Sequence, residues 1–295
     1  MVADKLKEIK GIKELLPFYD TFIFGLWGVL YEGGDRPLPG VMEALIKLKK
    51  AGKHIIILSN SAKPSALIAS RFASIGITNE MYDGILSAGE VLYYNLTRRK
   101  SGIFSRLGKR CLHLGKRSDW YFSSYYERVF KADAADFILL NRQLFRNEYL
   151  ESYLPILSAA LERNLPMLSI SADHFYYEED NAILDAGSLE NQYEKLGGLV
   201  IKTGKPDKSL FLYCLEALPE TKKSKTIVIG DSIETDIKGA DYSGLSSVFI
   251  AGGKHAKELD LYRGEPIDIE ALEELSRVYG CFPSYATSTL QWDEL

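Results

Sequence analysis

Four positions in this sequence combine residue types and spacing that suit the binding of a phosphate group and a divalent cation. Gly25, Ser59, Lys205 and Asp231 each lie at the end of a short run that is expected to form a strand. A serine hydroxyl and a lysine ammonium bind phosphate oxygens, and a carboxylate holds a hard cation such as Mg²⁺. Ligands of open parallel sheets bind beyond the carboxyl ends of the strands, so we expect these positions to meet at one edge of a sheet.

The most specific signal is the segment Gly230–Asp236, in which Asp231 and Asp236 straddle the first turn of an expected helix. Taken alone, Asp231 and Thr235 are explained as caps of that helix. A lone serine after a strand is also usually a cap, and a lone lysine in a loop is usually solvated. The order and spacing of all four positions together favour a binding site.

The elements that must position these residues alternate between apolar runs and amphipathic stretches. Strands are expected at 22–24, 54–58, 226–229 and 247–250, and helices at 41–51, 64–75, 209–218 and 233–243. Strands that alternate with helices across short turns predict an α/β fold, in which helices cover both faces of a doubly wound parallel sheet.

The middle of the chain, from residue 102 to residue 198, predicts a second α/β domain. Strands are expected there at 110–114, 137–140 and 167–170, and a helix is expected at 149–164. We interpret this stretch as an insertion into a first domain made of residues 1–101 and 199–295. Residues 1–16 alternate charged with apolar side chains, which predicts a short amphipathic helix rather than a signal peptide.

Composition excludes several classes of protein. Of the 295 residues, 46% are hydrophobic, which is enough for a sizeable core. The 36 basic and 40 acidic residues give a net charge of −4, which excludes the basic footprint of most nucleic-acid-binding proteins. No segment approaches the roughly 20 apolar residues of a membrane-spanning helix. The three cysteines form no CxxC pair, so we expect no disulfide framework or zinc site and a cytoplasmic setting.

Together these motifs make the sequence resemble the haloacid dehalogenase superfamily of phosphatases, in class IIA, whose members carry a large α/β cap. Ile57–Asn60 looks like the second motif of that family, Gly204–Pro206 like the third, and Gly230–Asp236 like the fourth. Trp27–Val29 is similar to the first motif of an uncharacterised bacterial branch of the class. The resemblance covers nearly the whole chain, and it identifies residues 102–198 as the cap.

The resemblance also implies a role for each matching residue. The residues implied to bind phosphate are Ser59, Asn60 and Lys205. Asp231 and the backbone carbonyl of Trp27 would hold Mg²⁺, and Asp236 would support them without touching the ion. Asp173 stands in the cap where many relatives have Asn-Pro-Asp, and it would contact the substrate. The implied partner is a small phosphorylated metabolite, and caps of this class often pair, which implies a homodimer.

The first motif departs from the family at its two catalytic positions. Active members have an aspartate nucleophile and, two residues later, an aspartate that acts as general acid and base; here these positions hold Gly25 and Trp27. Glycine forms no aspartyl-phosphate, and the missing carboxylate is expected to weaken Mg²⁺ binding. Trp27 takes up no proton, whereas general acid–base catalysis is typically worth about 10²–10⁴-fold. The chain is therefore predicted to be impaired or inactive in catalysis.

Three functions are compatible with these residues. The first is a protein with a phosphatase fold that binds phosphorylated ligands with reduced or no turnover. The second is an active phosphatase that uses water or another carboxylate, with Glu32 and Asp35 as candidates because Asp20 lies at the opposite end of the strand. The third is an interaction or structural protein with a vestigial pocket. A glycine introduced into a working enzyme would also produce this sequence.

Two further features are given ordinary structural interpretations. Gly252–His255 follows an expected strand and is interpreted as a simple turn. The aromatic residues of 120–130 are interpreted as part of the cap's own core.

Overall fold

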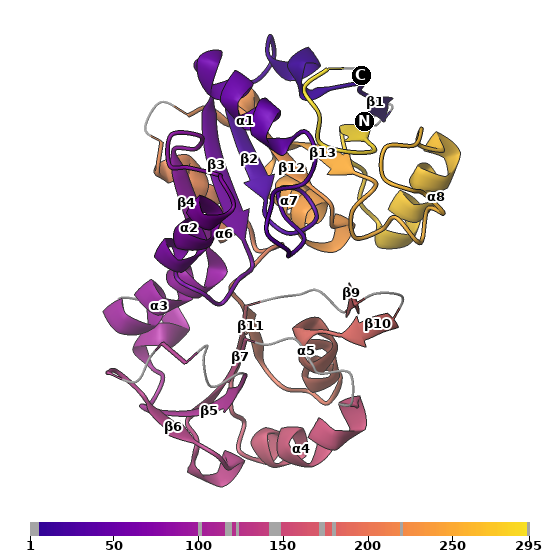
Figure 1. The fold of residues 1–295 in the computed structure, drawn as a ribbon. Coiled ribbons are helices and arrows are strands. Elements are labelled where there is room, and N and C mark those ends of the chain that lie inside the picture. The colour runs from indigo at the N-terminus through magenta and orange to yellow at the C-terminus, as the bar shows by residue number, and fades with distance from the viewer. Residues whose placement is uncertain are drawn as a thin grey trace. The chain divides into compact units, whose positions relative to one another are not determined.

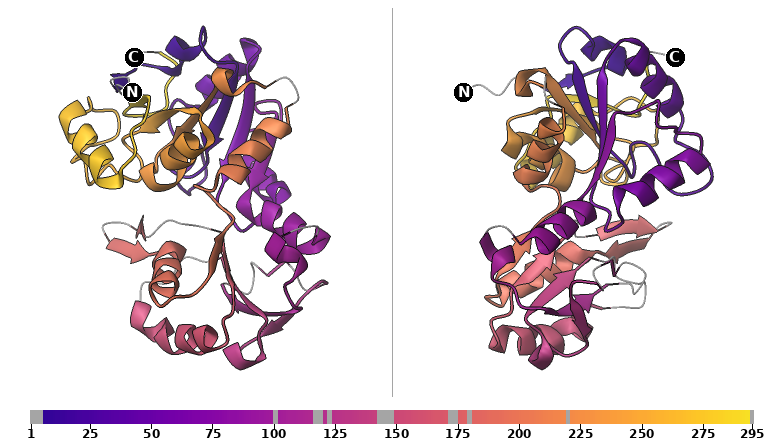
Figure 2. Two further views of the ribbon diagram at one scale, coloured as in Figure 1. Left: turned by 180° about the vertical axis from the view of Figure 1, so that it is seen from behind. Right: turned by 90° about the vertical axis from the view of Figure 1, so that its left-hand side faces the viewer.

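The chain divides into two compact units in a computed structural model (Figures 1 and 2). One unit consists of residues 1–59, 65–86 and 206–295, and the other of residues 60–64 and 87–205. The structure describes residues 6–99, 102–115, 120–121, 124–141, 149–170, 175–178, 181–218 and 221–293, with the backbone alone for 175–178 and 181–184.

The first unit is built on a seven-stranded sheet in the order β1-β14-β13-β12-β2-β3-β4. The strands are β1 (Lys7–Glu8), β2 (Thr21–Gly25), β3 (His54–Ser59), β4 (Gly84–Ser87), β12 (Thr226–Gly230), β13 (Ser246–Ile250) and β14 (Tyr285–Thr287). β2 pairs in parallel with β3 on one side and with β12 on the other, and β13 and β14 continue outward in parallel. This confirms the predicted doubly wound parallel sheet.

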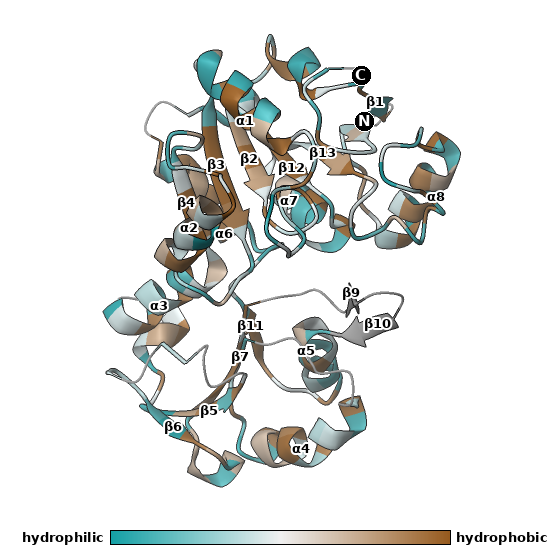
Figure 3. Ribbon diagram, in the orientation of Figure 1, coloured by the Kyte–Doolittle hydropathy of each residue, from teal (hydrophilic) through white to brown (hydrophobic). Residues whose placement is uncertain are grey.

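Helices cover both faces of this sheet. They are α1 (Val41–Lys50), α2 (Ser65–Ser74), α6 (Lys208–Glu216), α7 (Lys238–Ser243) and α8 (Ile269–Tyr279), with a π-helical turn η7 (Ile233–Ile237) before α7 and a 3-10 turn η6 (Lys223–Lys225) before β12. On β13, Val248 and Ile250 pack in one cluster with α1 and α2, whereas Phe249 packs with η7 and α8. Alternate side chains of a strand point to opposite faces, so the central strands are apolar throughout, as Figure 3 shows.

The second unit holds a five-stranded parallel sheet in the order β11-β8-β7-β5-β6. Its strands are β5 (Arg110–Leu114), β6 (Glu127–Val129), β7 (Phe137–Leu140), β8 (Met167–Ser169) and β11 (Val200–Lys202), with β9 (Phe175–Glu178) and β10 (Asn181–Leu184) as a separate antiparallel pair. Its helices are α3 (Ala88–Arg98), α4 (Leu154–Glu162) and α5 (Ala186–Lys195), with 3-10 turns at Gly102–Ser105, Ala132–Ala134 and Leu150–Tyr153. Within the described part of the chain, no helix is long and apolar enough to cross a bilayer.

The second unit is longer than the insertion expected over 102–198, because it also contains α3 and β11. β11 pairs with β8, and the Tyr126 hydroxyl donates a hydrogen bond to the Leu96 carbonyl of α3 at 2.8 Å. Lys205 therefore follows a strand of the second sheet. The expectation that its strand shares a sheet with those before Gly25 and Asp231 is wrong.

The helix predicted over residues 1–16 is also wrong for the part that the structure describes. β1 pairs with β14, and only a 3-10 turn, η1 (Ile12–Leu15), follows. The backbone N–H groups of Ile12 and Lys13 donate at 3.0 Å to carbonyl groups of residues 291–292. These bonds to the C-terminal tail replace the local hydrogen bonds of a helix. We call this contact the terminal clasp.

We expect Gly11→Ala to lower the free energy of unfolding by about 1–3 kcal/mol, the usual cost of overpacking. The φ of Gly11 is −170°, which any residue adopts, but a Cβ there would lie 2.4 Å from the backbone oxygen of Trp292 in the terminal clasp. Gly84→Ala is the matched control, since nothing lies within 4 Å of the added carbon. Urea unfolding compares the two variants, and equal loss of stability would contradict the clasp.

Candidate functional site

The switch point of the first sheet lies between β2 and β12, from which the chain winds outward in two directions. Ligands of doubly wound folds bind beyond the carboxyl ends of the strands at such a point. Gly25 ends β2, Gly230 ends β12 immediately before Asp231, and Ser59 ends the neighbouring strand β3. The structure thus brings Gly25, Ser59 and Asp231 to one edge of one sheet.

Asp231 sits in a close-fitting backbone enclosure. Its buried carboxylate accepts the backbone N–H of Lys254 at Oδ2, at 2.9 Å. A Cβ at Gly28 would lie 1.8 Å from Asp231 Oδ2, and a Cβ at Gly253 would lie 2.4 Å from Asp231 Cβ. Gly28 also has a φ of +75°, which other residues rarely adopt. Glycine is therefore required at both neighbours for two loops to close over this carboxylate.

Asp236 lies next to the end of β2 and is also buried. A Cβ at Gly25 would lie 3.3 Å from Asp236 Oδ1, and a Cβ at Gly230 would lie 2.1 Å from Asp236 Cβ. Asp236 Oδ2 accepts the backbone N–H of Ser232 at 3.4 Å. Two buried carboxylates therefore follow β12, while the end of β2 beside them contributes no side chain.

Trp27 offers no acid or base at its position in the first motif. Its side chain is largely solvent-exposed, at 60%, and its ring makes an edge contact with Tyr31 at 5.7 Å between centroids. The indole nitrogen donates one hydrogen bond and takes up no proton. The loop after Trp27 is held by Arg71, which contacts the Tyr31 hydroxyl at 2.9 Å and the Gly34 carbonyl.

The carboxylates considered as substitute nucleophiles are engaged elsewhere or face solvent. Glu32 forms an ion pair with Arg263. The Asp35 side chain is 98% exposed. Asp20, which precedes β2, pairs with Lys53 at 2.8 Å, and this hydrogen bond holds the pKa of Asp20 below its usual value.

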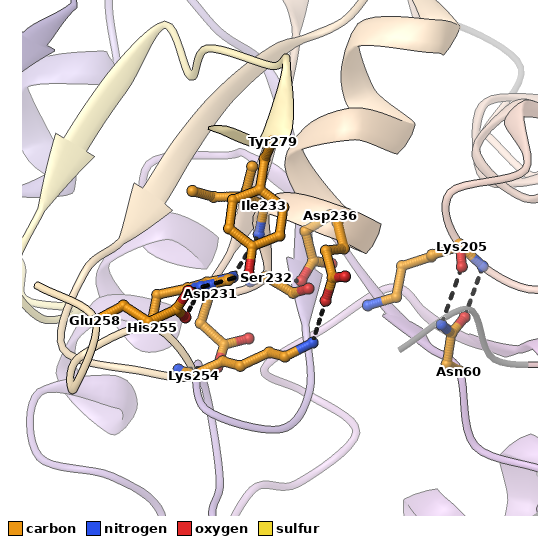
Figure 4. A network of polar contacts seen from close by, with 11 residues as sticks. Asn60, Lys205, Asp231, Ser232, Ile233, Asp236, Lys254, His255, Glu258 and Tyr279 are labelled. Atoms are coloured by element: carbon orange, nitrogen blue, oxygen red, sulfur yellow. Dashed lines mark hydrogen bonds and ion pairs between the residues drawn. The ribbon is translucent and has the colours of Figure 1, made fainter. Parts of the chain in front are cut away.

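The candidate phosphate ligands Asn60 and Lys205 are joined within the second unit (Figure 4). The Lys205 backbone N–H donates to Asn60 Oδ1 at 2.7 Å, and Asn60 Nδ2 donates to the Lys205 carbonyl at 3.2 Å. The Asn60 side chain thus fixes the backbone that carries the lysine, and its role as a phosphate ligand stays a prediction. Ser59 is buried at the end of β3 in the first unit, and Asp173 lies outside the described residues.

A polar network that the sequence analysis did not find joins the Asp231 loop to the turns after β13 (Figure 4). His255 is fully buried, and its Nε2 accepts the backbone N–H of Ile233 at 3.2 Å. Its Nδ1 lies 2.5 Å from Glu258 Oε2, and Glu258 Oε1 accepts the Tyr279 hydroxyl at 3.1 Å. Gly252–His255 forms turns, as predicted, and these turns also donate and accept hydrogen bonds at the Asp231 loop. The His-x-x-Glu spacing is the only sequence signal for this contact.

The network shifts the pKa values of the two acidic groups at its outer end, Glu258 and Tyr279. Burial of Glu258 opposes its ionisation, but hydrogen bonds from His255 and Tyr279 and the charge of Lys254 outweigh it, so the pKa of Glu258 lies below its usual value. Burial and the Glu258 charge raise the pKa of Tyr279. Glu258 is therefore a carboxylate and Tyr279 a phenol at neutral pH. Among the described residues, no three His, Cys, Asp or Glu side chains converge to hold a metal.

Two stretches of the chain match sequence models of one superfamily. Residues 22–121 match a haloacid dehalogenase-like hydrolase family, and residues 202–275 match a HAD-hydrolase-like family. The chain is 23% identical over 290 residues to a 4-nitrophenylphosphatase of Schizosaccharomyces pombe, covering 90% of this chain and 95% of that protein. It is 25% identical over 263 residues to a phospholysine phosphohistidine inorganic pyrophosphate phosphatase of Rattus norvegicus, covering 85% and 86%.

Solved structures share the fold. A haloacid dehalogenase-like hydrolase from Brucella suis superposes with a TM-score of 0.77 at 24% identity, covering 96% of this chain and 99% of that one. A glycerol phosphate phosphatase from Mycobacterium tuberculosis, in complex with magnesium, superposes with a TM-score of 0.65 at 19% identity, covering 97% and 80%. These likenesses extend over both units, and the two sequence models place the residues around Gly25 and Asp231 in the same superfamily. The chain is thus similar to haloacid dehalogenase-like hydrolases in sequence over residues 22–121 and 202–275, and in fold over nearly its whole length.

Proposed function

We propose that this protein binds small phosphomonoesters together with Mg²⁺ beyond the carboxyl ends of β2 and β12, with impaired or no hydrolysis. The observation that carries the proposal is the presence of two buried carboxylates, Asp231 and Asp236, beside a glycine at position 25. The phosphatase relatives support the binding function. The alternatives are an active phosphatase with another nucleophile and an interaction protein with a vestigial pocket.

The phosphate is bound by residues at two strand ends. The Ser59 hydroxyl donates to a phosphate oxygen, and the Lys205 ammonium pairs with the phosphate charge. Asn60 follows Ser59 directly in the chain and holds the Lys205 backbone through two hydrogen bonds, which links the two positions. The second unit acts as the cap, Asp173 contacts the remainder of the substrate, and two copies pair through their caps.

Mg²⁺ suits the residues at this edge, because it takes oxygen ligands and is often bound by one or two carboxylates with several waters. Asp231 and the backbone carbonyl of Trp27 would hold it, with Asp236 supporting them. When bound, Mg²⁺ neutralises and orients the phosphate. Because Gly25 adds no carboxylate, the affinity for Mg²⁺ is lower than with an aspartate there.

The impairment follows from two groups that the chain lacks. Family hydrolysis begins when an aspartate oxygen attacks phosphorus and forms an aspartyl-phosphate, and a second aspartate protonates the leaving group. Gly25 has no oxygen to attack, and Trp27 has no proton to exchange at neutral pH. Binding needs neither group, so the chain keeps the ligand-binding residues without the reacting ones.

We expect inorganic phosphate and Mg²⁺ to raise the melting temperature, since a ligand of the native state alone stabilises it, by about 2.7 kcal/mol at 100 times the Kd. Lys205→Ala should remove the phosphate effect, and Asp231→Asn should remove the Mg²⁺ effect. Lys50→Ala, at the exposed end of α1, is the control and should change neither. Scanning calorimetry measures the shifts, and their absence from the unmodified chain at millimolar ligand would favour the vestigial pocket.

We expect Gly25→Asp to release phosphate from phosphomonoesters with Mg²⁺, while the similarly shaped Gly25→Asn stays silent because an amide is no nucleophile. A Cβ at Gly25 would lie 3.3 Å from Asp236 Oδ1 and Val29 Cγ2, so these side chains must yield by a few tenths of an ångström. Adding Trp27→Asp should raise turnover by a further factor of about 10²–10⁴. A phosphate-release assay over a substrate panel measures the rates.

Two results would change the proposal. Turnover by the unmodified chain at the rate of Gly25→Asp would contradict impaired catalysis and direct attention to Glu32 and Asp35. Silence in all variants, including the double variant with Trp27→Asp, would favour the interaction protein.

A further inference from the structure

Residues 253–255 contact the segment 231–234 along consecutive positions. Gly253 packs against Asp231, and the Lys254 backbone N–H donates to its carboxylate. The Lys254 ammonium pairs with Glu234 at 2.8 Å. His255 Nε2 accepts the Ile233 N–H. The two loops therefore touch through packing, a backbone hydrogen bond, an ion pair and a ring nitrogen, and His255 ends this series in the buried interior.

The Ile233 N–H needs an acceptor from outside its own helix. The first four N–H groups of a helix have no partner within it, and a side chain usually satisfies one of them. Ser232, the residue before η7, makes no side-chain cap hydrogen bond. His255 supplies the acceptor from 22 residues further along the chain. An unsatisfied N–H at this buried position would cost about 1–3 kcal/mol, so the contact fixes the start of η7, two residues from Asp231.

The hydrogen bonds of His255 define one tautomer. A ring nitrogen that accepts from a backbone N–H carries no hydrogen, so Nε2 is bare and Nδ1 carries the proton. Nδ1 then donates to Glu258, which also accepts from Tyr279 on α8. The ring of His255 packs between Phe249 at 5.8 Å and Tyr279 at 5.1 Å between centroids. Its orientation is therefore set by β13 and α8, which are elements of the sheet and its helical cover.

We propose that His255 is a positioning residue for Asp231. Its Nε2 holds the Ile233 backbone, Glu258 and Tyr279 hold its ring, and Asp231 is thereby kept in the enclosure formed by Gly28 and Gly253. The consequence for ligand binding rests on the proposed function, in which Asp231 holds Mg²⁺. The positioning itself does not depend on a metal.

The test compares His255→Gln with His255→Asn in the full chain. The glutamine amide reaches the position of Nε2 and offers an oxygen to Ile233, whereas the shorter asparagine reaches only the position of Nδ1. Tyr193→Phe, which removes one buried hydrogen bond in the second unit and leaves this network intact, is the control for a general loss of stability. Amide hydrogen exchange at Ile233, measured without metal, reports the hydrogen bond. Calorimetric titration with Mg²⁺ reports the metal site.

We expect His255→Asn to speed exchange at Ile233 at least about tenfold and to weaken Mg²⁺ binding by about 10–100-fold, the usual effect of removing a group that supports a metal ligand. His255→Gln should stay close to the unmodified chain in both measurements. Equal behaviour of the two variants in folded protein would overturn the proposal. If the unmodified chain binds no Mg²⁺ but the exchange pattern holds, the positioning stands and the proposed function fails.

A measurement on the unmodified chain decides the question even if both variants fail to fold. The ¹⁵N shifts of the His255 imidazole distinguish a bare Nε2 from a protonated one. A bare Nε2 with a proton on Nδ1 supports the proposal. A proton on Nε2 overturns it, because that nitrogen then cannot accept from Ile233.

Discussion

The close approach of three loops to one buried carboxylate, that of Asp231, constrains this end of the first unit. A buried charge is costly unless it is hydrogen-bonded, and here the backbone N–H of Lys254 supplies a bond. Gly28 and Gly253 lie so near that no side chain fits at either position. The turn after β2, the start of η7 and the turns after β13 therefore constrain one another's positions. A shift in any of them would displace the carboxylate.

Gly25 changes the electrostatics of this edge as well as its chemistry. Asp231 and Asp236 already place two buried carboxylates after β12, and an aspartate at position 25 would add a third beside Asp236. Like charges at such short range repel strongly in a buried site unless a cation is present. With glycine the site needs less positive charge to be stable. In the proposed function, Gly25 therefore both removes the nucleophile and avoids this third charge.

In the proposed function, the groups that bind and the groups that would react lie in different surroundings. Asp231, Ser59 and the Asn60–Lys205 pair are held by backbone hydrogen bonds or buried at strand ends. Trp27 and the loop after it lie exposed and are fixed by arginine contacts at the surface. A change at position 27 is therefore expected to disturb the surrounding scaffold less than a change at the buried position 25.

The sequence by itself determined the doubly wound sheet, because apolar runs and helical periodicity are local patterns. Apart from the helix expected over residues 1–16, the strands and helices expected for the first unit lie within two residues of their observed bounds, with η7 and α7 together forming the helix expected at 233–243. The motifs around Gly25, Ser59 and Asp231 could be found for the same reason. Only the tertiary structure decided that Lys205 follows a strand of the second sheet, and that residues 7–15 pair with the C-terminal tail. The contact of His255 with the segment after Asp231 could not be predicted from the sequence either. These three features rest on contacts between residues far apart in the chain, which no local spacing records.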